Sequence, residues 1–121
     1  MSEENSKYDL EERTFRFALS LRKCLGEANW KPVQWTDVNQ LLRSSGSIAA
    51  NYTEANNAVS KPDFLHKIGI SKKEAAESLL WLRLLAATTD ELEITEKLRT
   101  LHTECDELTR ILATIHRNSQ K

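Results

Sequence analysis

The sequence predicts an all-α protein, an antiparallel up-down four-helix bundle formed by one domain over residues 1–121. Only three glycines and two prolines occur, which is few for a fold with many turns. Helix-forming Ala, Leu, Glu, Lys and Arg are abundant. Apolar residues also recur every three or four positions over four long segments that short connections separate, as in a helical bundle.

The first helix is predicted over residues 9–28. Asp9 and Glu12 have the spacing of a capping box, and acidic residues suit the start of a helix. One face is apolar along its whole length, which predicts that it lies on the core. This face carries Leu10, Phe17, Leu21, Cys24, Leu25 and Ala28.

The connection after this helix, residues 29–35, contains Pro32 and two tryptophans. Aromatic rings readily fill apolar gaps, so Trp30 and Trp35 are expected to cover one end of the bundle. Stacking on a nucleic-acid base, or docking of a partner, is the alternative role for these two rings.

The second helix is predicted over residues 37–57, with Thr36 or Asp37 as its cap. Its core face carries Val38, Leu41, Leu42, Ser45, Ile48, Ala49, Tyr52 and Ala55. The other side has small and polar residues in place of long charged ones, which indicates that another helix approaches closely. A buried charge needs a partner, so Arg43 and Glu54 are expected to be paired, within the chain or between chains.

The third helix is predicted over residues 61–87. Ser60 can cap it, Pro62 fits its first turn, and Asp63 follows three residues after the cap. The residues on its core face are Phe64, Leu65, Ile68, Ala75, Leu79, Leu82 and Ala86.

Lys72 falls inside this apolar face, where a charge is costly. Its ammonium group either reaches out to solvent or pairs with an acid such as Glu104 or Asp106 of the last helix.

The fourth helix is predicted over residues 95–117, with Leu92 and Ile94 tucked under the bundle before it. Its apolar residues alternate by three and four, as in a coiled coil, and its other faces are charged. This seam carries Leu98, Leu101, Cys105, Leu108, Leu112 and Ile115. Cys24 and Cys105 are expected to be small reduced core residues, and a disulfide is the alternative.

Residues outside the core faces predict a homo-oligomer. Leu79 and Trp81 lie about 200° apart on the third helix, so both cannot point into one small core. Large exposed apolar patches usually mark interfaces. The candidate interface residues are Tyr8, Phe15, Leu19, Arg43, Ser47, Asn51, Glu54, Ile70, Glu74, Glu77, Trp81 and Leu85.

The formal net charge of −1 argues against a wholly basic nucleic-acid-binding protein. Mixed charges usually form a solvated face, but an oligomer would repeat each basic patch and could bind phosphate weakly. The candidate residues for this are Arg13, Arg16, Lys23, Lys61, Lys67 and Lys73.

The sequence offers no catalytic constellation. A di-iron bundle needs two Glu-x-x-His motifs, and only Asp63 with His66 approximates one of them. No nucleophile, base and orienting group can be named together, so we expect a non-enzyme without metal or cofactor. No apolar run approaches the roughly 18 residues of a membrane span, so a cytoplasmic protein without membrane contact is expected.

The central part of the chain, with QLLRSSGSIAANYTEA followed by SKPDFLHKIGISKKEAAESLLWLRLL, resembles the bacterial four-helix-bundle proteins found in intervening sequences of 23S ribosomal RNA genes. The resemblance covers nearly the whole chain and also includes Asp9-Leu10, Phe17-Ala18 and residues 105–112. The matching central positions are Gln40 to Ser44, Ser47-Ile48, Asn51, Glu54, Ser60-Lys61, Phe64, Lys73-Glu74, Glu77 and Trp81-Leu82.

The resemblance implies a four-helix bundle and, as in relatives, a homopentamer around a central channel. The family is also similar to the accessory protein of diversity-generating retroelements, a basic pentamer that binds nucleic acid and a reverse transcriptase. Lys72 departs from the family pattern, which is usually apolar there, and the near-neutral charge weakens the link to nucleic acid. The expected role is a non-enzymatic accessory or scaffold protein associated with RNA or DNA. The alternative is a protein-interaction module that does not bind nucleic acid.

Overall fold

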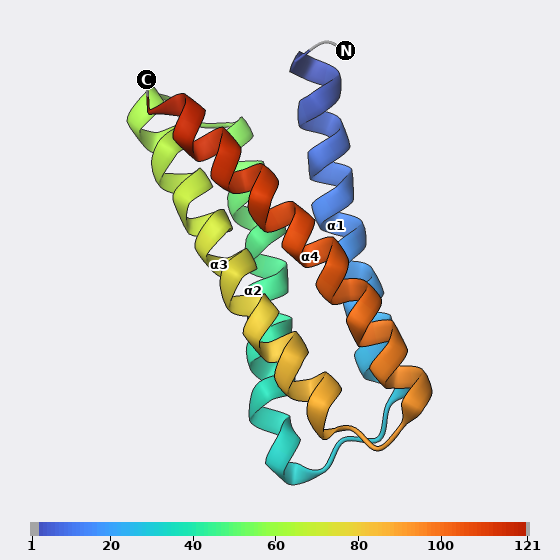
Figure 1. The fold of residues 1–121 in the computed structure, drawn as a ribbon. Coiled ribbons are helices and arrows are strands. Elements are labelled where there is room, and N and C mark those ends of the chain that lie inside the picture. Colours follow the sequence, from blue (N-terminus) through green and yellow to red (C-terminus); the bar gives the residue numbers. More distant parts are fainter. Residues whose placement is uncertain (1–2, 121) are drawn as a thin grey trace.

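The computed structural model describes the backbone of residues 3–120 and the side chains of residues 9–120. Four helices and no strand occur in this range, which confirms the predicted all-α class: α1 (Glu3–Glu27), α2 (Pro32–Asn56), α3 (Lys61–Thr88) and α4 (Leu92–Ser119). The start of α1, the α2–α3 loop and the end of α4 lie at one end of the bundle (Figure 1). The helices therefore alternate in direction, and the other two loops share the opposite end.

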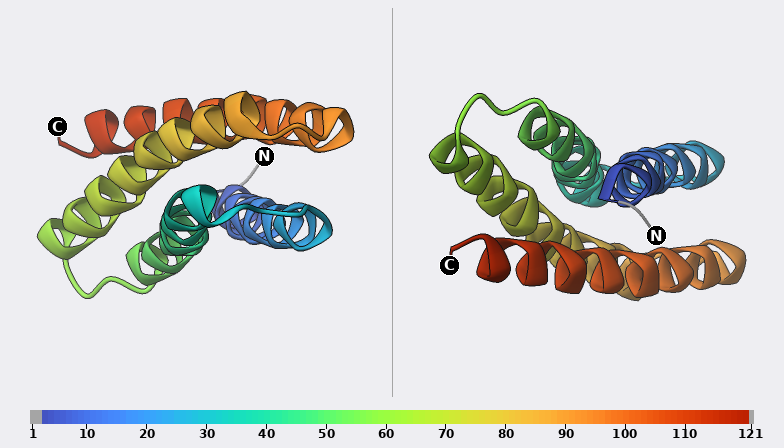
Figure 2. Two further views of the ribbon diagram at one scale, coloured as in Figure 1. Left: turned by 90° about the horizontal axis from the view of Figure 1, so that it is seen from below. Right: turned by 90° about the horizontal axis from the view of Figure 1, so that it is seen from above.

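The helices form a closed ring of neighbours in the order α1, α2, α3, α4. Helix α3 packs most extensively, against both α2 and α4, whereas α1 contacts α2 and α4 over shorter stretches. Over residues 3–120, no Cα atom of α1 lies within 8 Å of a Cα atom of α3, so these two helices lie diagonally across the bundle. The end-on views show α1 beside α2 on one side and α3 beside α4 on the other (Figure 2).

The core is formed by the apolar faces that the helical periodicity predicts. Every residue predicted for a core face is buried or half-buried. Full burial of each large aliphatic side chain stabilises the fold by about 1.5–3 kcal/mol. The fully buried aliphatic residues are Leu21, Leu41, Ile48, Ile68, Leu82, Leu85, Leu98, Leu108 and Leu112.

Both cysteines are buried and free, as predicted, so the disulfide alternative is wrong. The thiol of Cys105 donates a hydrogen bond to the carbonyl of Ala75 at 3.3 Å. Burial raises the pKa of the Cys105 thiol to about 12, and burial also raises the pKa of Cys24.

Helix α2 begins at Pro32, not near Asp37 as the sequence predicted. The side-chain oxygen of Gln34 accepts a hydrogen bond from the backbone N–H of Lys31 at 2.9 Å, which closes the first turn. Gln34 is buried, and its side-chain amide also bonds to Thr88 at the end of α3. The third helix therefore helps to hold this turn in place. Proline is well suited to the first turn, since it has no N–H to leave unpaired.

Helices α1 and α4 also begin earlier than predicted. Helix α1 starts at Glu3, so Asp9 lies within it and does not cap it. Helix α4 starts at Leu92, which is 71% exposed and not tucked under the bundle as expected. Ile94 is buried as predicted. Ser60 caps α3 as predicted, because its hydroxyl accepts a hydrogen bond from the N–H of Asp63.

The two tryptophans of the first connection differ in role. Trp30 packs against the core, and its indole N–H donates to the carbonyl of Leu25 at 2.8 Å. This ring covers the end of the bundle as predicted. Trp35 lies on the first turns of α2 and remains 56% exposed, so the capping role is wrong for this residue.

Candidate functional site

The seam between α2 and α3 contains a row of buried serines. The hydroxyls of Ser44 and Ser78 lie 2.7 Å apart, and Ser78 donates to the carbonyl of Glu74. The hydroxyl of Ser71 donates to the carbonyl of Ile48 in the neighbouring helix at 2.8 Å. Small side chains allow two helix backbones to approach closely. The helix that the small residues of α2 predicted is therefore α3 of the same chain.

The outer edge of this seam is covered by the ion pairs of Arg43 with Glu74 and Glu77, which we call the α2–α3 fork. The guanidinium of Arg43 bonds to Glu74 at 3.0 Å and also to Glu77, while its Nε contacts Gln40. These bonds, first that to Glu77 and then that to Glu74, raise the pKa of Arg43. The Glu74 side chain is only 12% exposed, so this carboxylate depends on the fork for compensation.

Three further polar residues of α2, Ser47, Asn51 and Glu54, also have partners within the chain. Glu54 pairs with Lys67 of α3 at 3.6 Å, and the amide of Asn51 donates to Ser47 one turn earlier. The predicted pairing of Arg43 and Glu54 is thus confirmed for each residue, with partners on α3 in both cases.

The candidate interface residues divide into exposed and covered groups. Phe15 is 55% exposed and Leu19 is 38% exposed on the outer face of α1. Ile70 and Trp81 are half-buried, and Trp81 packs against the core. Leu85 is fully buried inside the chain, so its assignment to an outer face was wrong. The side chain of Tyr8 lies outside the described residues.

The outer face of α3 is more apolar than the sequence analysis predicted. Leu80 is 48% exposed and Leu84 is 38% exposed, and Ala76 and Ala87 on the same face are exposed as well. Leu80 was missed because, on the helical wheel, it falls between the predicted core face of this helix and Trp81. Its exposure becomes evident only when the positions of α2 and α4 are known.

The indole nitrogen of Trp81 is buried, and no acceptor for it exists among residues 9–120. An unsatisfied buried donor costs about 1–3 kcal/mol. Trp81 thus carries an energetic cost, although the sequence placed this family-pattern residue away from the core.

Three of the candidate phosphate-binding cations are already engaged by carboxylates. Arg13 bonds to Glu104 through two nitrogens at 2.8 Å and contacts Glu107 at 3.0 Å. Arg16 pairs with Glu12, and Lys67 pairs with Glu54.

The other three candidates, Lys23, Lys61 and Lys73, are exposed. Lys23 and Lys73 form no ion pair with any other described side chain. The six candidates come from α1 and α3, which lie diagonally across the bundle, so the fold does not gather them into one patch.

Lys72 is half-buried, and its two predicted acidic partners form ion pairs with other residues. Glu104 binds Arg13, and Asp106 binds Arg110. Lys72 itself forms no ion pair in the part of the chain with described side chains. The pairing alternative is therefore wrong, which leaves the alternative in which the ammonium group reaches solvent.

Two surface grooves run along α4. The groove between α1 and α4 has a volume of about 510 Å³ and contains both signs of charge, with Lys97 bonded to Glu27. Cys24 lines it, but burial raises the pKa of this thiol and so disfavours the nucleophilic thiolate. The groove between α3 and α4 has a volume of about 430 Å³ and contains Arg83 and Arg99.

The described side chains do not form a metal site. Across residues 9–120, no three His, Cys, Asp or Glu side chains lie close enough together to hold an ion. Asp63 and His66 therefore gain no further ligand from the fold. Among the described helices, none has the length and apolar character to cross a bilayer.

Comparison with known proteins agrees with this architecture. A family model described as 23S rRNA-intervening sequence protein matches residues 5–114. The chain belongs to this family. A crystal structure at 1.70 Å resolution, of a protein with unknown function from the S23 ribosomal protein family of Bacteroides thetaiotaomicron VPI-5482, superposes with a TM-score of 0.75. The two chains are 31% identical, and the alignment covers 88% of this chain and 97% of the other.

Membership of the 23S rRNA-intervening sequence protein family confirms the resemblance seen in the sequence. No curated protein matches the chain. The match defines family and fold, and the solved relative is itself of unknown function.

Proposed function

We propose that this protein is a non-enzymatic scaffold or accessory protein of the cytoplasm that acts as a homo-oligomer. The observation that carries the proposal is the uncovered apolar face of α3. Leu80 and Leu84 are one turn apart and both exposed, so they form a continuous apolar surface on one side of the chain. Contiguous apolar surface of this kind usually marks an interface.

A second uncovered face makes a cyclic assembly geometrically reasonable. Phe15 and Leu19 lie one turn apart on α1, and α1 and α3 occupy opposite sides of the bundle. A contact between two different faces of identical chains is heterologous, and repeated contacts of this kind close into a ring when the rotation permits. The family resemblance implies five subunits for this ring.

Light scattering on variants with an aspartate in either face tests this proposal. We expect Phe15→Asp and Leu80→Asp each to lower the molar mass, because a buried carboxylate at the interface has no partner. Val59→Asp is the matched control, since Val59 lies in the α2–α3 loop and is 94% exposed. Circular dichroism confirms that each variant keeps its helices. Variants of unchanged mass would place the interface elsewhere.

Chemical features of the chain support the non-enzymatic part of the proposal. The two thiols are buried with raised pKa values, which keeps them protonated near neutral pH. The carboxylates of the α2–α3 fork are bound to Arg43 and are not free to act as bases.

Association with RNA or DNA is a second candidate function, favoured by the unpaired arginines of the α3–α4 groove. Gel-shift titration at low and raised salt tests it, because an electrostatic mode weakens steeply with salt. If neither RNA nor DNA binds at low salt, a protein-interaction module without nucleic acid becomes the better account.

A further inference from the structure

The groove between α3 and α4 differs from the rest of the surface in its charge. Arg83 of α3 and Arg99, His102 and Thr103 of α4 line it, and no carboxylate does. Among residues 9–120, neither arginine forms an ion pair. Elsewhere, Arg13, Arg16, Arg43 and Arg110 are each bound to a carboxylate. Arg22 and Arg117 bond to uncharged oxygens, and neither of them lines this groove.

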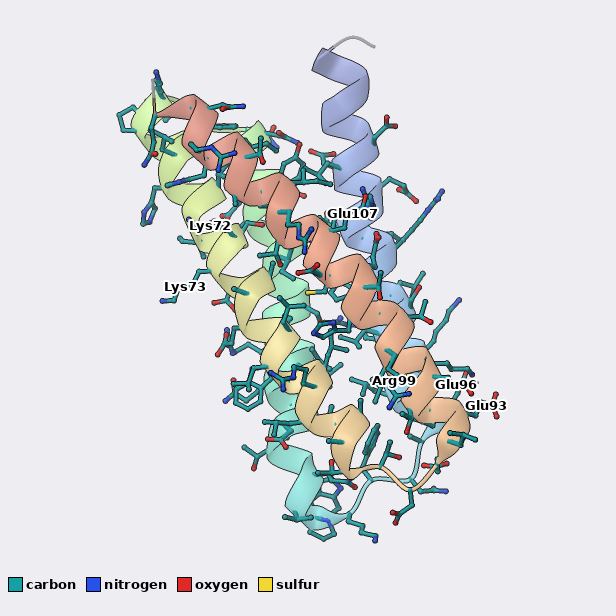
Figure 3. The ribbon with its side chains drawn as sticks, viewed as in Figure 1. Lys72, Lys73, Glu93, Glu96, Arg99 and Glu107 are labelled. Atoms are coloured by element: carbon teal, nitrogen blue, oxygen red, sulfur yellow. The ribbon has the colours of Figure 1, made fainter. Side chains whose placement is uncertain are left out.

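The groove between α1 and α4 provides an internal comparison. There, Lys97 forms ion pairs with Glu27 and Glu93, so carboxylates within the groove neutralise its positive charge. Arg99 lies on the side of α4 nearer α3, whereas Glu93 and Glu96 lie at the opposite edge (Figure 3). Helix α4 thus separates a groove of mixed charge from a groove whose charged residues are arginines.

The floor of the α3–α4 groove is apolar. Its accessible part consists of the half-buried Ala86 and the exposed Ala87, while Leu82 and Leu98 also line the groove but are fully buried. A volume of about 430 Å³ is within the usual range for small-molecule sites, roughly 300–1,000 Å³. The groove therefore combines a cationic rim with an uncharged floor.

This combination suits a phosphate ester that carries a flat or apolar group. A guanidinium presents paired N–H donors that match two phosphate oxygens, and the Thr103 hydroxyl adds a further polar group. An uncharged ring system attached to the phosphate would cover the aliphatic floor.

The positive charge continues along α3 beyond the groove. Lys73 precedes Arg83 by ten residues, or about 15 Å of helix, and both Lys72 and Lys73 lie on α3 without an acidic partner among the described side chains (Figure 3). Two acids of α3 on this stretch, Glu74 and Glu77, are held by Arg43, and Asp106 of α4 is held by Arg110. Such a row of charges is long enough to follow more than one phosphate.

We propose that the α3–α4 groove binds a nucleotide phosphate, free or within a single strand, with Arg83 and Arg99 as the phosphate ligands. The proposal deepens the nucleic-acid part of the proposed function. It does not depend on self-association, since both helices belong to one chain.

Fluorescence anisotropy with a labelled single-stranded RNA oligomer at low salt tests the groove. The double variant Arg83→Gln/Arg99→Gln is expected to bind about tenfold more weakly or worse, since each charge-assisted contact is worth more than 1 kcal/mol. Loss of two contacts should also reduce the slope of log K against log salt by about 1.4. The control Lys31→Gln/Arg117→Gln removes the same charge from two exposed positions outside the groove and is expected to bind like the unaltered protein.

Competition identifies the source of the phosphate. Displacement of the RNA by adenosine monophosphate at similar concentration would assign the groove to free nucleotides, and much weaker displacement would assign it to a strand. If the groove variant binds RNA as tightly as the unaltered protein, the proposal that the groove binds phosphate is wrong. Nucleic-acid association would then take place at another surface. If the unaltered protein binds neither RNA nor adenosine monophosphate, both proposals fail. Light scattering on the same samples reports self-association separately.

Discussion

The hydroxyl of Ser44 on α2 lies 2.7 Å from the hydroxyl of Ser78 on α3, and both side chains are fully buried. Either hydroxyl can donate in this contact, because each also lies within reach of a carbonyl of its own helix, that of Leu41 for Ser44 and that of Glu74 for Ser78. Helices α2 and α3 form the most extensively packed pair of the bundle, and Arg43 lies over the Glu74 and Glu77 carboxylates at the edge of this seam.

Enlarging Ser78 is expected to separate the two helices. Ser78→Leu should lower the free energy of unfolding by about 3 kcal/mol, because a well-packed site resists extra methylenes. Ser78→Ala removes only the hydroxyl, with its contacts to Ser44 and to the Glu74 carbonyl, and should cost about 1–2 kcal/mol. Urea denaturation of the two variants provides the comparison, and equal losses would show that the seam is not tightly packed.

Removal of the Arg43 guanidinium leaves Glu74, which is 12% exposed, without its partner. We expect Arg43→Gln to lower the free energy of unfolding by about 1 kcal/mol or somewhat more, since a partly buried carboxylate is then uncompensated. Arg16→Gln is the control, because Arg16 and Glu12 are exposed and such a pair contributes less than about 1 kcal/mol. A smaller loss for Arg43→Gln than for the control would contradict the structural role of the fork.

Alkaline pH is expected to destabilise the fold through Cys105. Burial raises the pKa of this thiol from 9.0 to about 12, so the unfolded chain releases a proton that the folded chain keeps. The free energy of unfolding therefore falls as pH rises above 9, by about 1 kcal/mol at about pH 10 from this group.

Cys105→Ala should flatten this alkaline loss, even though the lost packing lowers stability at every pH. Cys24 and Tyr52, whose pKa values burial also raises, would retain part of the slope. Denaturation midpoints at about pH 8 and about pH 10 measure the effect. Parallel curves for the variant and the unaltered protein would rule out Cys105 as the source.

Because the indole N–H of Trp81 has no acceptor, the fold is expected to tolerate replacement of this residue by phenylalanine. Trp81→Phe should change the free energy of unfolding by less than about 1 kcal/mol, because removing the unsatisfied donor offsets the lost contact area. Trp30→Phe is the matched comparison, since its N–H donates to the Leu25 carbonyl and its loss leaves that acceptor unpaired. Equal destabilisation by both changes would indicate that Trp81 finds an acceptor in solution.

The fold class and the core faces could be predicted from the sequence because both depend on helical periodicity. The start of α3 could also be predicted, since Ser60, Pro62 and Asp63 are local signals. The start of α2 could not, because Lys31 is an unusual cap and the turn is held by Gln34 and its contact with Thr88.

Charge pairing was the least predictable feature of the candidate site. Arg13 looked like a free cation on α1, yet its partner Glu104 lies 91 residues away in the sequence. Conversely, Arg83 and Arg99 belong to different helices, and only the packing of α3 on α4 brings them to one groove. Helical-wheel positions alone cannot identify such partners.

The central claim, self-association through the outer faces of α1 and α3, is tested most directly by the molar mass of the unaltered protein. Sedimentation equilibrium over a range of concentrations measures it without any label or substitution. The proposal predicts a defined multiple of the 13.9 kDa chain, and five times that mass for the assembly implied by the resemblance. A single species of 13.9 kDa at all concentrations would contradict it.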